Sequence, residues 1–530
     1  MKKQNTQRFL WIGWIMWAGI SLIGCSVIPG RSGKPETILP AAISPTESPD
    51  PTTFTDWRTS TPEEQGMDST TLAKMLAFVK DKKLDFHSIL VIRNGFIVSE
   101  AYLPPFQADI PHDIASCGKT VAASLLGIAL DKGYLKSVDQ KMLEFFPDRA
   151  VANNDAAKQS ITLKHMLTMS AGLEWDDWRP VDARNTSFQM QQSRDPVQFV
   201  LDRKMANKPG ERWNYSEGLF NMVSTVVSQS TQMSVPAFGE KYLFGPIGVS
   251  KVGWRRNPGG GYAVGLTPRD SAKFALLFLN QGIWNGKQVI STSWVNDSTA
   301  NHIQTGVSDQ GYGYMWWLPP FGGYAADGDG GQRIYVVPDK NLIVVTMAGM
   351  TYPDMETHPE NLMTTYILPA VKSADPLPEN KAGVGQMKQL TQELAQPVIK
   401  PVPSSPATAG LISGKTYTLK PNSIGFEKVG FNFTGQTAQV EMTFGGRSQK
   451  MDIGLNNLYR INPVSMGPIY GWLGLRGSWD YESTFRMDLL ADGRARVMVF
   501  RFADDAVTVW FKGSRGEVEE ILGQASAGNP

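Results

Sequence analysis

Hydrophobic residues form short β-rich blocks at two places far apart in the chain, and each place has the pattern of a β-hairpin. Residues 87–93 and 96–102 flank Asn94-Gly95, the dipeptide that most strongly favours a two-residue hairpin turn. Residues 333–337 and 342–347 flank a turn in the same way. Between the hairpins the apolar periodicity is mostly helical, at 120–132, 162–169, 220–230 and 268–280. These patterns predict an α+β fold, with one antiparallel sheet built from both ends of this region and flanked by helices.

The pattern changes after residue 347. A further helix near 359–371 and a short helical stretch at 386–394 precede a proline-rich segment at 397–406. Beyond it come β-rich runs at 415–419, 440–444, 484–490, 495–502 and 506–511, separated by turn signals. We predict a first domain over 54–374, a linker over 375–408 and an all-β, barrel-like domain over 409–520.

The first residues have the features of an export signal. A basic start precedes an apolar run at 9–23, which is too short to span a membrane comfortably. Leu22-Ile-Gly-Cys25 resembles the lipobox of bacterial lipoproteins, in which the cysteine is lipidated and becomes the new N-terminus. The alternative is an uncleaved anchor helix, with its tryptophans at the membrane interface. We predict a signal peptide over 1–24, lipidation at Cys25 and a proline-rich tether over 25–53, so that the protein is exported, anchored to the cell membrane and faces outside the cytoplasm.

Composition narrows the range of chemistries. The formal net charge of +1 gives no reason to expect a nucleic-acid partner. Cys25 and Cys117 are the only cysteines, so with Cys25 lipidated no disulfide framework can form. The sequence contains no Gly-x-Ser-x-Gly elbow, no His-Glu-x-x-His and no phosphate loop, and its five histidines are scattered. We therefore predict neither a metal nor a cofactor, and among the histidines only His112 lies close to candidate chemistry.

Ser116 and Lys119 are three residues apart at the start of a predicted helix, so their side chains share one face. A serine hydroxyl needs a base to become a nucleophile, and a lysine can be that base when its ammonium form is disfavoured. Burial and the positive end of the helix both act in that direction. Ser-x-x-Lys also occurs by chance, and Ser116 alone could be a helix N-cap.

The chain between residues 57 and 347 resembles the serine beta-lactamase and penicillin-recognising superfamily. Its class C-like branch includes esterases, D-amino-acid peptidases and nylon-oligomer hydrolases. The resemblance rests on motifs that occur in the expected order, namely Ser116-Cys-Gly-Lys119, Ile161-Thr-Leu-Lys-His-Met-Leu-Thr-Met-Ser-Ala-Gly172, Trp213-Asn-Tyr-Ser-Glu217, Leu266-Thr-Pro-Arg-Asp270, Gly311-Tyr-Gly-Tyr-Met-Trp-Trp317 and Gly328-Asp-Gly-Gly-Gln332. The tryptophans of the fifth motif belong either to the core or to the wall of a substrate cleft.

The resemblance implies a role for several residues. Tyr215 matches the tyrosine that shares the proton of the nucleophile with the lysine and passes it to the leaving group. The family's third motif falls on Asp329-Gly330-Gly331, and the backbone N–H groups of Ser116 and Gln332 would form the oxyanion hole.

Two residues depart from the family pattern. Glu217 stands where the family has Asn, and Asp329 stands where it has Lys or His. Asp329, in place of that cation, would repel the carboxylate of a beta-lactam or D-alanyl-D-alanine substrate. We therefore predict an acyl-enzyme hydrolase acting on a small-molecule or peptide-like ester or amide. The alternatives are a beta-lactamase or D-amino-acid peptidase, and a binding or sensor lipoprotein without turnover.

Overall fold

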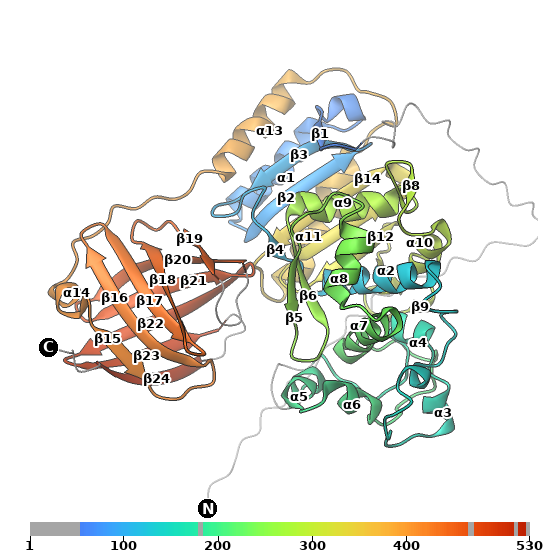
Figure 1. Ribbon diagram of the computed structural model, residues 1–530. Helices are drawn as coiled ribbons and strands as arrows, with labels where there is room; N and C mark the ends of the chain where they lie inside the picture. Colours follow the sequence, from blue (N-terminus) through green and yellow to red (C-terminus); the bar gives the residue numbers. More distant parts are fainter. Residues whose placement is uncertain (1–53, 179–183, 465–470, 514–517, 526–530) are drawn as a thin grey trace, which may run out of the picture. The chain divides into compact units, whose positions relative to one another are not determined.

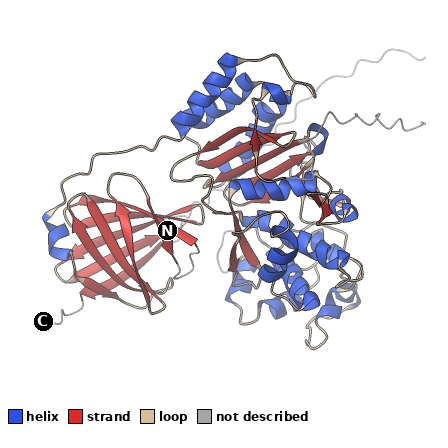
Figure 2. Cartoon of the chain, turned by 45° about the horizontal axis from the view of Figure 1, so that its top comes forward, coloured by secondary structure: helices blue, strands red, loops and turns tan. Residues whose placement is uncertain are grey.

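The computed structural model describes residues 54–178, 184–464, 471–513 and 518–525. The expected signal peptide, Cys25 and the tether lie outside the described residues. Along the described chain, a region of mixed helices and strands is followed by a β-barrel. Figure 2 shows most helices in the first region and mainly strands in the barrel. In the described residues no helix combines the length and apolar character needed to span a membrane.

The central sheet of the first region joins segments from both of its ends, as the two hairpins predict. Within the described residues it has nine strands, and neighbours are antiparallel except for β1 and β3. The strands lie in the order β1 (Arg58–Thr59), β3 (Phe96–Tyr102), β2 (Phe86–Arg93), β14 (Leu342–Ala348), β13 (Gln332–Val337), β12 (Tyr324–Gly328), β11 (Trp317–Leu318), β10 (Gly311–Tyr312) and β9 (Ile303–Gln304).

Helices cover both faces of this sheet, which explains why all eight residues of β2 are buried. Ile89 and Val91 point to one face and pack with α1 (Ser69–Asp81), the π-helical segment η6 (Leu362–Ile367) and α13 (Lys381–Leu394). Leu90 and Ile92 point to the other face and join the larger core around α2 (Gly118–Asp131), α7 (Glu217–Thr231) and α9 (Pro268–Leu279). Figure 1 shows α1 and α13 together on one side of the sheet.

The part of the chain expected to be a linker contributes to this region. Met387 and Leu394 of α13 are buried against the α1 side of the sheet, so the first packed unit continues past residue 374.

Shorter elements complete the region. The helices are α3 (Ala156–Gln159), α4 (Leu163–Leu167), α5 (Thr186–Gln192), α6 (Pro196–Leu201), α8 (Val235–Gly239), α10 (Thr292–Ser298), α11 (Asp354–Asn361) and α12 (Leu368–Ala370). The single turns are η1 (Glu63–Gln65), η2 (Ala115–Cys117), η3 (Met142–Phe145), η4 (Glu240–Phe244) and η5 (Pro338–Lys340). A small sheet joins β4 (His112–Asp113), β6 (Tyr262–Leu266) and β5 (Gly253–Arg256), and a two-stranded ribbon joins β7 (Ile283–Trp284) and β8 (Lys287–Gln288).

The C-terminal strands close into a barrel, which confirms the barrel-like interpretation of the sequence. In the part of the barrel that the structure describes, nine strands form the ring, because β18 also pairs with β20 between Gly454 and Arg476. Strand β19 extends the sheet beyond β20. The strands are β15 (Thr416–Leu419), β16 (Phe426–Thr434), β17 (Thr437–Phe444), β18 (Arg447–Gly454), β19 (Arg460–Val464), β20 (Gly471–Tyr481), β21 (Thr484–Ala491), β22 (Arg494–Ala503), β23 (Ala506–Lys512) and β24 (Val518–Ala525). Side chains alternate between the filled interior and the outside, as in other small barrels.

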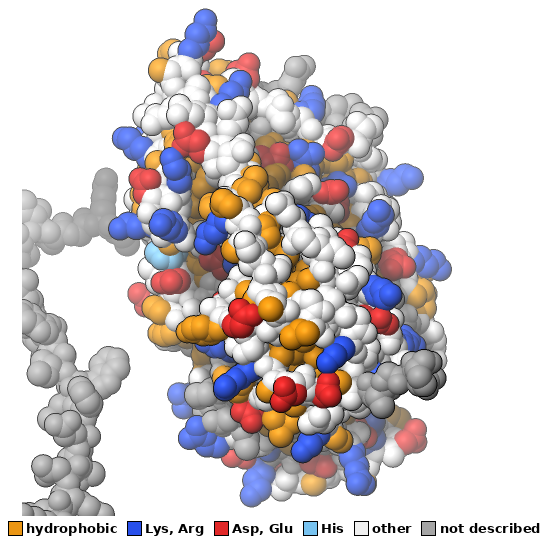
Figure 3. Space-filling view, turned by 90° about the vertical axis from the view of Figure 1, so that its left-hand side faces the viewer, with side chains coloured by type: hydrophobic (Ala, Val, Ile, Leu, Met, Phe, Trp, Pro, Cys, Tyr) orange, Lys and Arg blue, Asp and Glu red, His pale blue; other side chains and the backbone are white. Residues whose placement is uncertain are grey.

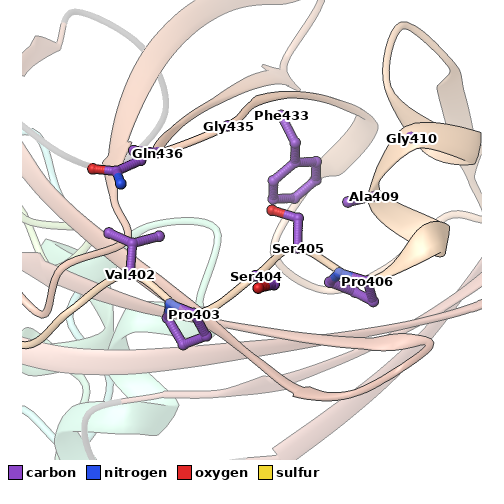
Figure 4. A pocket seen from close by; sticks show the side chains of 10 residues that line it. All are labelled: Val402, Pro403, Ser404, Ser405, Pro406, Ala409, Gly410, Phe433, Gly435 and Gln436. Atoms are coloured by element: carbon purple, nitrogen blue, oxygen red, sulfur yellow. The ribbon is translucent and has the colours of Figure 1, made fainter.

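One end of the barrel carries a shallow pocket of about 350 Å³. The segment before α14 (Ala407–Ile412) and the β16–β17 turn line it, and Figure 4 shows Ser405 beside the ring of Phe433. On the face shown in Figure 3, basic and acidic side chains are interspersed, with small hydrophobic groups between them. No single sign of charge dominates that face.

Candidate active site

Ser116 lies in the single turn η2, between strand β4 and helix α2. The residue before it, Ala115, has a φ of +49°, a left-handed conformation that costs a non-glycine residue free energy. The Asp113 carboxylate holds this bend, because it accepts a hydrogen bond from the Ala115 N–H at 2.7 Å and pairs with Arg255 at 3.0 Å. The bend leaves Ser116 partly exposed at the start of α2.

Lys119 is one helical turn further along and buried, with 4% of its side chain exposed. Its Nζ donates hydrogen bonds to Ser116 Oγ at 3.0 Å and to Glu217 Oε2 at 2.6 Å. The same Nζ lies 4.9 Å from the ring centres of Tyr215 and Phe220. The spacing in the sequence predicted the first contact, and the contact with Glu217 could not be predicted from it.

Tyr215 approaches the same two residues from the start of helix α7. Its phenol interacts electrostatically with both Ser116 and Lys119, and its ring faces Lys119 Nζ. Ser216 caps the helix by accepting a hydrogen bond from the Leu219 N–H at 3.2 Å. Serine, lysine and tyrosine are therefore brought together as the family resemblance implied.

Asp177 is a further residue of this arrangement, which the sequence did not identify. Its carboxylate accepts a hydrogen bond from the Glu217 N–H at 2.8 Å and another from Ser187 Oγ. It thus binds one of the N–H groups that the first turn of a helix leaves unsatisfied. Burial raises the pKa of the Asp177 carboxyl, and the hydrogen bonds oppose that shift.

The protonation of the site differs from the expectation drawn from the sequence. Burial lowers the pKa of Lys119, but the negative charge of Glu217 and the interaction with Tyr215 outweigh burial, and the net shift is upward. Burial raises the pKa of Tyr215, against the opposing effect of the Lys119 charge. The resting site therefore contains a lysine ammonium and a neutral phenol. The expectation that burial and the helix would disfavour the ammonium was wrong because it omitted Glu217.

The third motif forms the turn between β12 and β13, next to the nucleophile. A Cβ on Gly328 would lie 2.7 Å from the Ile114 carbonyl and 3.2 Å from the Ala115 Cβ, so this turn contacts the bend that carries Ser116. Gly330 and Gly331 have φ values of +89° and +92°, which glycine alone adopts readily.

The side chain of Gln332 holds this turn in place. Its Nε2 donates to the Asp329 carbonyl at 3.1 Å and to the Ala348 carbonyl at 2.7 Å, and its Oε1 accepts from the Ala348 N–H at 2.9 Å. The Gln332 carbonyl faces Cys117 Sγ at 3.5 Å. Gln332 therefore positions this turn through its side chain, and the oxyanion role that the resemblance implies for its backbone N–H stays a prediction.

Asp329 is paired with a residue far away in the sequence. Its Oδ2 lies 2.7 Å from Nη2 of Arg494, at the start of strand β22 in the barrel. Nothing in the sequence indicated this partner, and the guanidinium offsets part of the negative charge that we expected to repel a substrate carboxylate.

Aromatic side chains surround Tyr215. Trp178 has 63% of its surface exposed and lies 6.1 Å from Tyr215 between ring centres, while Trp317 stacks on Tyr215 at 6.3 Å. Trp213 contacts both tryptophans. The neighbouring Trp316 is fully buried in the core. The two tryptophans of the fifth motif thus divide between the core and the surroundings of Tyr215.

The other two residues considered near the nucleophile, His112 and Cys117, are buried. His112 is buried and its Nε2 lies 2.8 Å from Nδ1 of His87. Burial, and then the charge of His87, lower the pKa of His112 to about 3. Cys117 is buried beneath the bend, and burial raises the pKa of its thiol. Among the described residues no cluster of three or more His, Cys, Asp and Glu side chains could hold a metal ion.

Comparison with known families agrees with this geometry. The beta-lactamase family model matches residues 77–363, which is more than half of the chain. The chain belongs to the beta-lactamase family. The mixed sheet flanked by helices is the fold of that family, whose relatives include hydrolases and acyltransferases.

The relatives of this beta-lactamase-family chain are distant. It is 22% identical over 316 residues to the 6-aminohexanoate-dimer hydrolase of Paenarthrobacter ureafaciens, covering 54% of this chain and 78% of the relative. It is 25% identical over 161 residues to the monacolin J acid methylbutanoyltransferase of Aspergillus terreus, covering 28% of this chain and 39% of the relative. The solved octameric penicillin-binding protein homologue of Pyrococcus abyssi is 15% identical, with a TM-score of 0.44, over 86% of this chain and all of that chain.

Proposed function

We propose that the protein is a serine hydrolase that forms an acyl-enzyme on Ser116 and acts on an ester or amide. The observation that carries the proposal is the convergence of Lys119 Nζ and the Tyr215 hydroxyl on Ser116, with the lysine 3.0 Å from Ser116 Oγ. A nucleophile within hydrogen-bond reach of its proton acceptor is the arrangement that covalent catalysis requires. The family relatives named as a hydrolase and an acyltransferase support acyl transfer.

In the proposed cycle, neutral Lys119 removes the proton of Ser116 as Oγ attacks the substrate carbonyl carbon. The carbonyl oxygen becomes negative, and backbone N–H groups of Ser116 and Gln332 stabilise it. When the bond to the leaving group breaks, Tyr215 gives its proton to that group and recovers one from Lys119. Water then attacks the acyl-enzyme through the same relay, and releases the acid and Ser116.

Glu217 sets the pH at which this cycle operates. Because the competent form has a neutral lysine and Glu217 raises the lysine pKa, the proposal implies activity that increases toward alkaline pH. A Lys119 that stays in its ammonium form would equally suit a binding or sensor protein that does not hydrolyse its ligand. Turnover and labelling of Ser116 distinguish the two functions.

The experiment is turnover of p-nitrophenyl esters and anilides, followed by pH-stat with the wild type and Ser116→Ala. We expect hydrolysis by the wild type and none above background by Ser116→Ala. A fluorophosphonate should label the wild type and leave Ser116→Ala unlabelled. Labelling without turnover would favour the sensor. An active, labelled Ser116→Ala would refute the proposal.

We also propose that the protein is an exported lipoprotein anchored through Cys25. The support is the signal-like start and the lipobox-like Leu22-Ile-Gly-Cys25. Metabolic labelling with a fatty-acid analogue should mark the wild type and leave Cys25→Ala unmarked. Labelling that survives this change would contradict the anchor.

A further inference from the structure

The turn between barrel strands β21 and β22 contacts the segment that leads to the nucleophile. Asp492 and Gly493 form this turn with φ values of +53° and +73°. A Cβ on Gly493 would lie 2.0 Å from the ring of His112, so the turn packs directly on that ring. His112 belongs to strand β4, and Ser116 follows four residues later.

Apolar and polar contacts of neighbouring barrel strands reinforce this docking. Trp472 of β20 donates a hydrogen bond from its Nε1 to the Pro111 carbonyl at 3.1 Å. Its ring also meets Phe106 edge-on, with Leu490 of β21 in the same cluster. The turn is braced from within the barrel, where Arg496 Nη1 donates to the Ala491 carbonyl at 3.1 Å.

Arg494 is the residue by which this turn meets the third motif. Its Nη2 lies 2.7 Å from Asp329 Oδ2, and both side chains keep some exposure, 23% for Arg494 and 39% for Asp329. Asp329 directly precedes Gly330 and Gly331, in the turn that contacts the Ala115 bend and that Gln332 holds. A partly exposed ion pair therefore stands beside the site where the acyl group would be bound.

We propose that Arg494, supplied by the C-terminal barrel, is a specificity-determining residue of the active site, because it neutralises Asp329 and so allows substrates that carry a carboxylate. The inference rests on the proposed hydrolase function. With the pair intact, the two opposite charges largely cancel at the distance of a substrate. Removal of Arg494 takes the positive charge of the pair away, so the Asp329 carboxylate repels an anionic substrate more strongly. Removal of Asp329 instead leaves the guanidinium to attract such a substrate.

The test compares an anionic substrate with its neutral methyl ester, mono-p-nitrophenyl glutarate and methyl p-nitrophenyl glutarate, and follows release of p-nitrophenol from both. The quantity is the ratio of kcat/KM for the anionic substrate to that for the neutral one. We expect Arg494→Ala to lower this ratio about tenfold and Asp329→Ala to raise it about tenfold, which corresponds to roughly 1.4 kcal/mol of charge interaction in each case. The double variant should return to within about twofold of the wild type.

Arg486→Ala is the matched control, because Arg486 pairs with Asp488 within barrel strand β21 at 2.8 Å. It should leave the ratio unchanged. To separate this inference from the hydrolase proposal, the same two esters are bound to the Ser116→Ala forms and measured by calorimetry, where no turnover is needed. The ratio of Kd values should shift in the same directions. Unchanged ratios in both measurements, or equal changes with Arg486→Ala, would overturn the role of Arg494.

Discussion

Replacement of Glu217 by Gln tests the account of the lysine. The carboxylate lies 2.6 Å from Lys119 Nζ, and its charge is the largest of the contributions that raise the lysine pKa. Two unit charges about 4 Å apart interact by roughly 4 kcal/mol at an effective dielectric near 20, and 1.36 kcal/mol corresponds to one pKa unit. Without Glu217 the effect of burial prevails, and the pKa of Lys119 falls.

The expected result follows from the direction of this change. Neutral Lys119 is the competent form, and its raised pKa means that kcat/KM of the wild type should still be rising at the alkaline end of the assay. In Glu217→Gln the rising limb should move to lower pH by about 2 to 3 pH units, so that the variant is the more active at each pH of the assay. The assay is pH-stat hydrolysis of a neutral ester from about pH 6 to about pH 10. Glu174→Gln is the control, since that carboxylate is exposed and paired with Arg203 at 3.5 Å.

Two results would refute the reasoning. An unchanged limb would show that Lys119 is not the titrating base. Loss of activity at every pH, in a variant that keeps the thermal midpoint of the wild type, would show that Glu217 itself accepts the proton.

Three other changes have expected outcomes. Gly331→Ala forces a side chain onto a φ of +92°, with its Cβ 3.2 Å from that of Ala348. We therefore expect about 1–3 kcal/mol of destabilisation in denaturant unfolding and a reduced kcat in ester turnover. A variant with wild-type stability would contradict the geometry. His112 has a folded-state pKa lowered to about 3, so the stability that it contributes is present above about pH 6.5 and is lost as pH falls toward 3. The thermal midpoint of His112→Gln should therefore fall less steeply below about pH 6 than that of the wild type. Equal slopes would refute this. Trp178→Ala should lower kcat/KM for aromatic esters a few-fold relative to acetyl esters with little effect on stability, and an equal loss for both would exclude Trp178 from the substrate cleft.

Local patterns were sufficient for much of the fold. The Asn94-Gly95 turn and the alternation around it are local signals, and the structure has strands β2 and β3 on either side. The three-residue spacing of Ser116 and Lys119 likewise determines their proximity once a helix begins there. The third motif was located by the family resemblance alone, and the positive φ values of Gly330 and Gly331 came only from the structure.

Contacts between distant segments were beyond such reasoning. Glu217 was recognised only as a departure from the family pattern, because nothing in its own neighbourhood shows that it lies against Lys119, 98 residues away. Arg494 is 165 residues from Asp329, and its position depends on barrel closure and on docking of the β21–β22 turn. A charged residue beside an Asp-Gly turn is ordinary for a barrel, so the sequence contained no signal for this pair.

The central claim is that Ser116 becomes acylated. The most direct measurement is intact-protein mass after rapid acid quench of the wild type with a slowly released ester, followed by peptide mapping. The account predicts a mass increase equal to the acyl group, located on the peptide that contains Ser116 and absent from Ser116→Ala. An adduct on another residue, or turnover in Ser116→Ala at the wild-type rate, would contradict it.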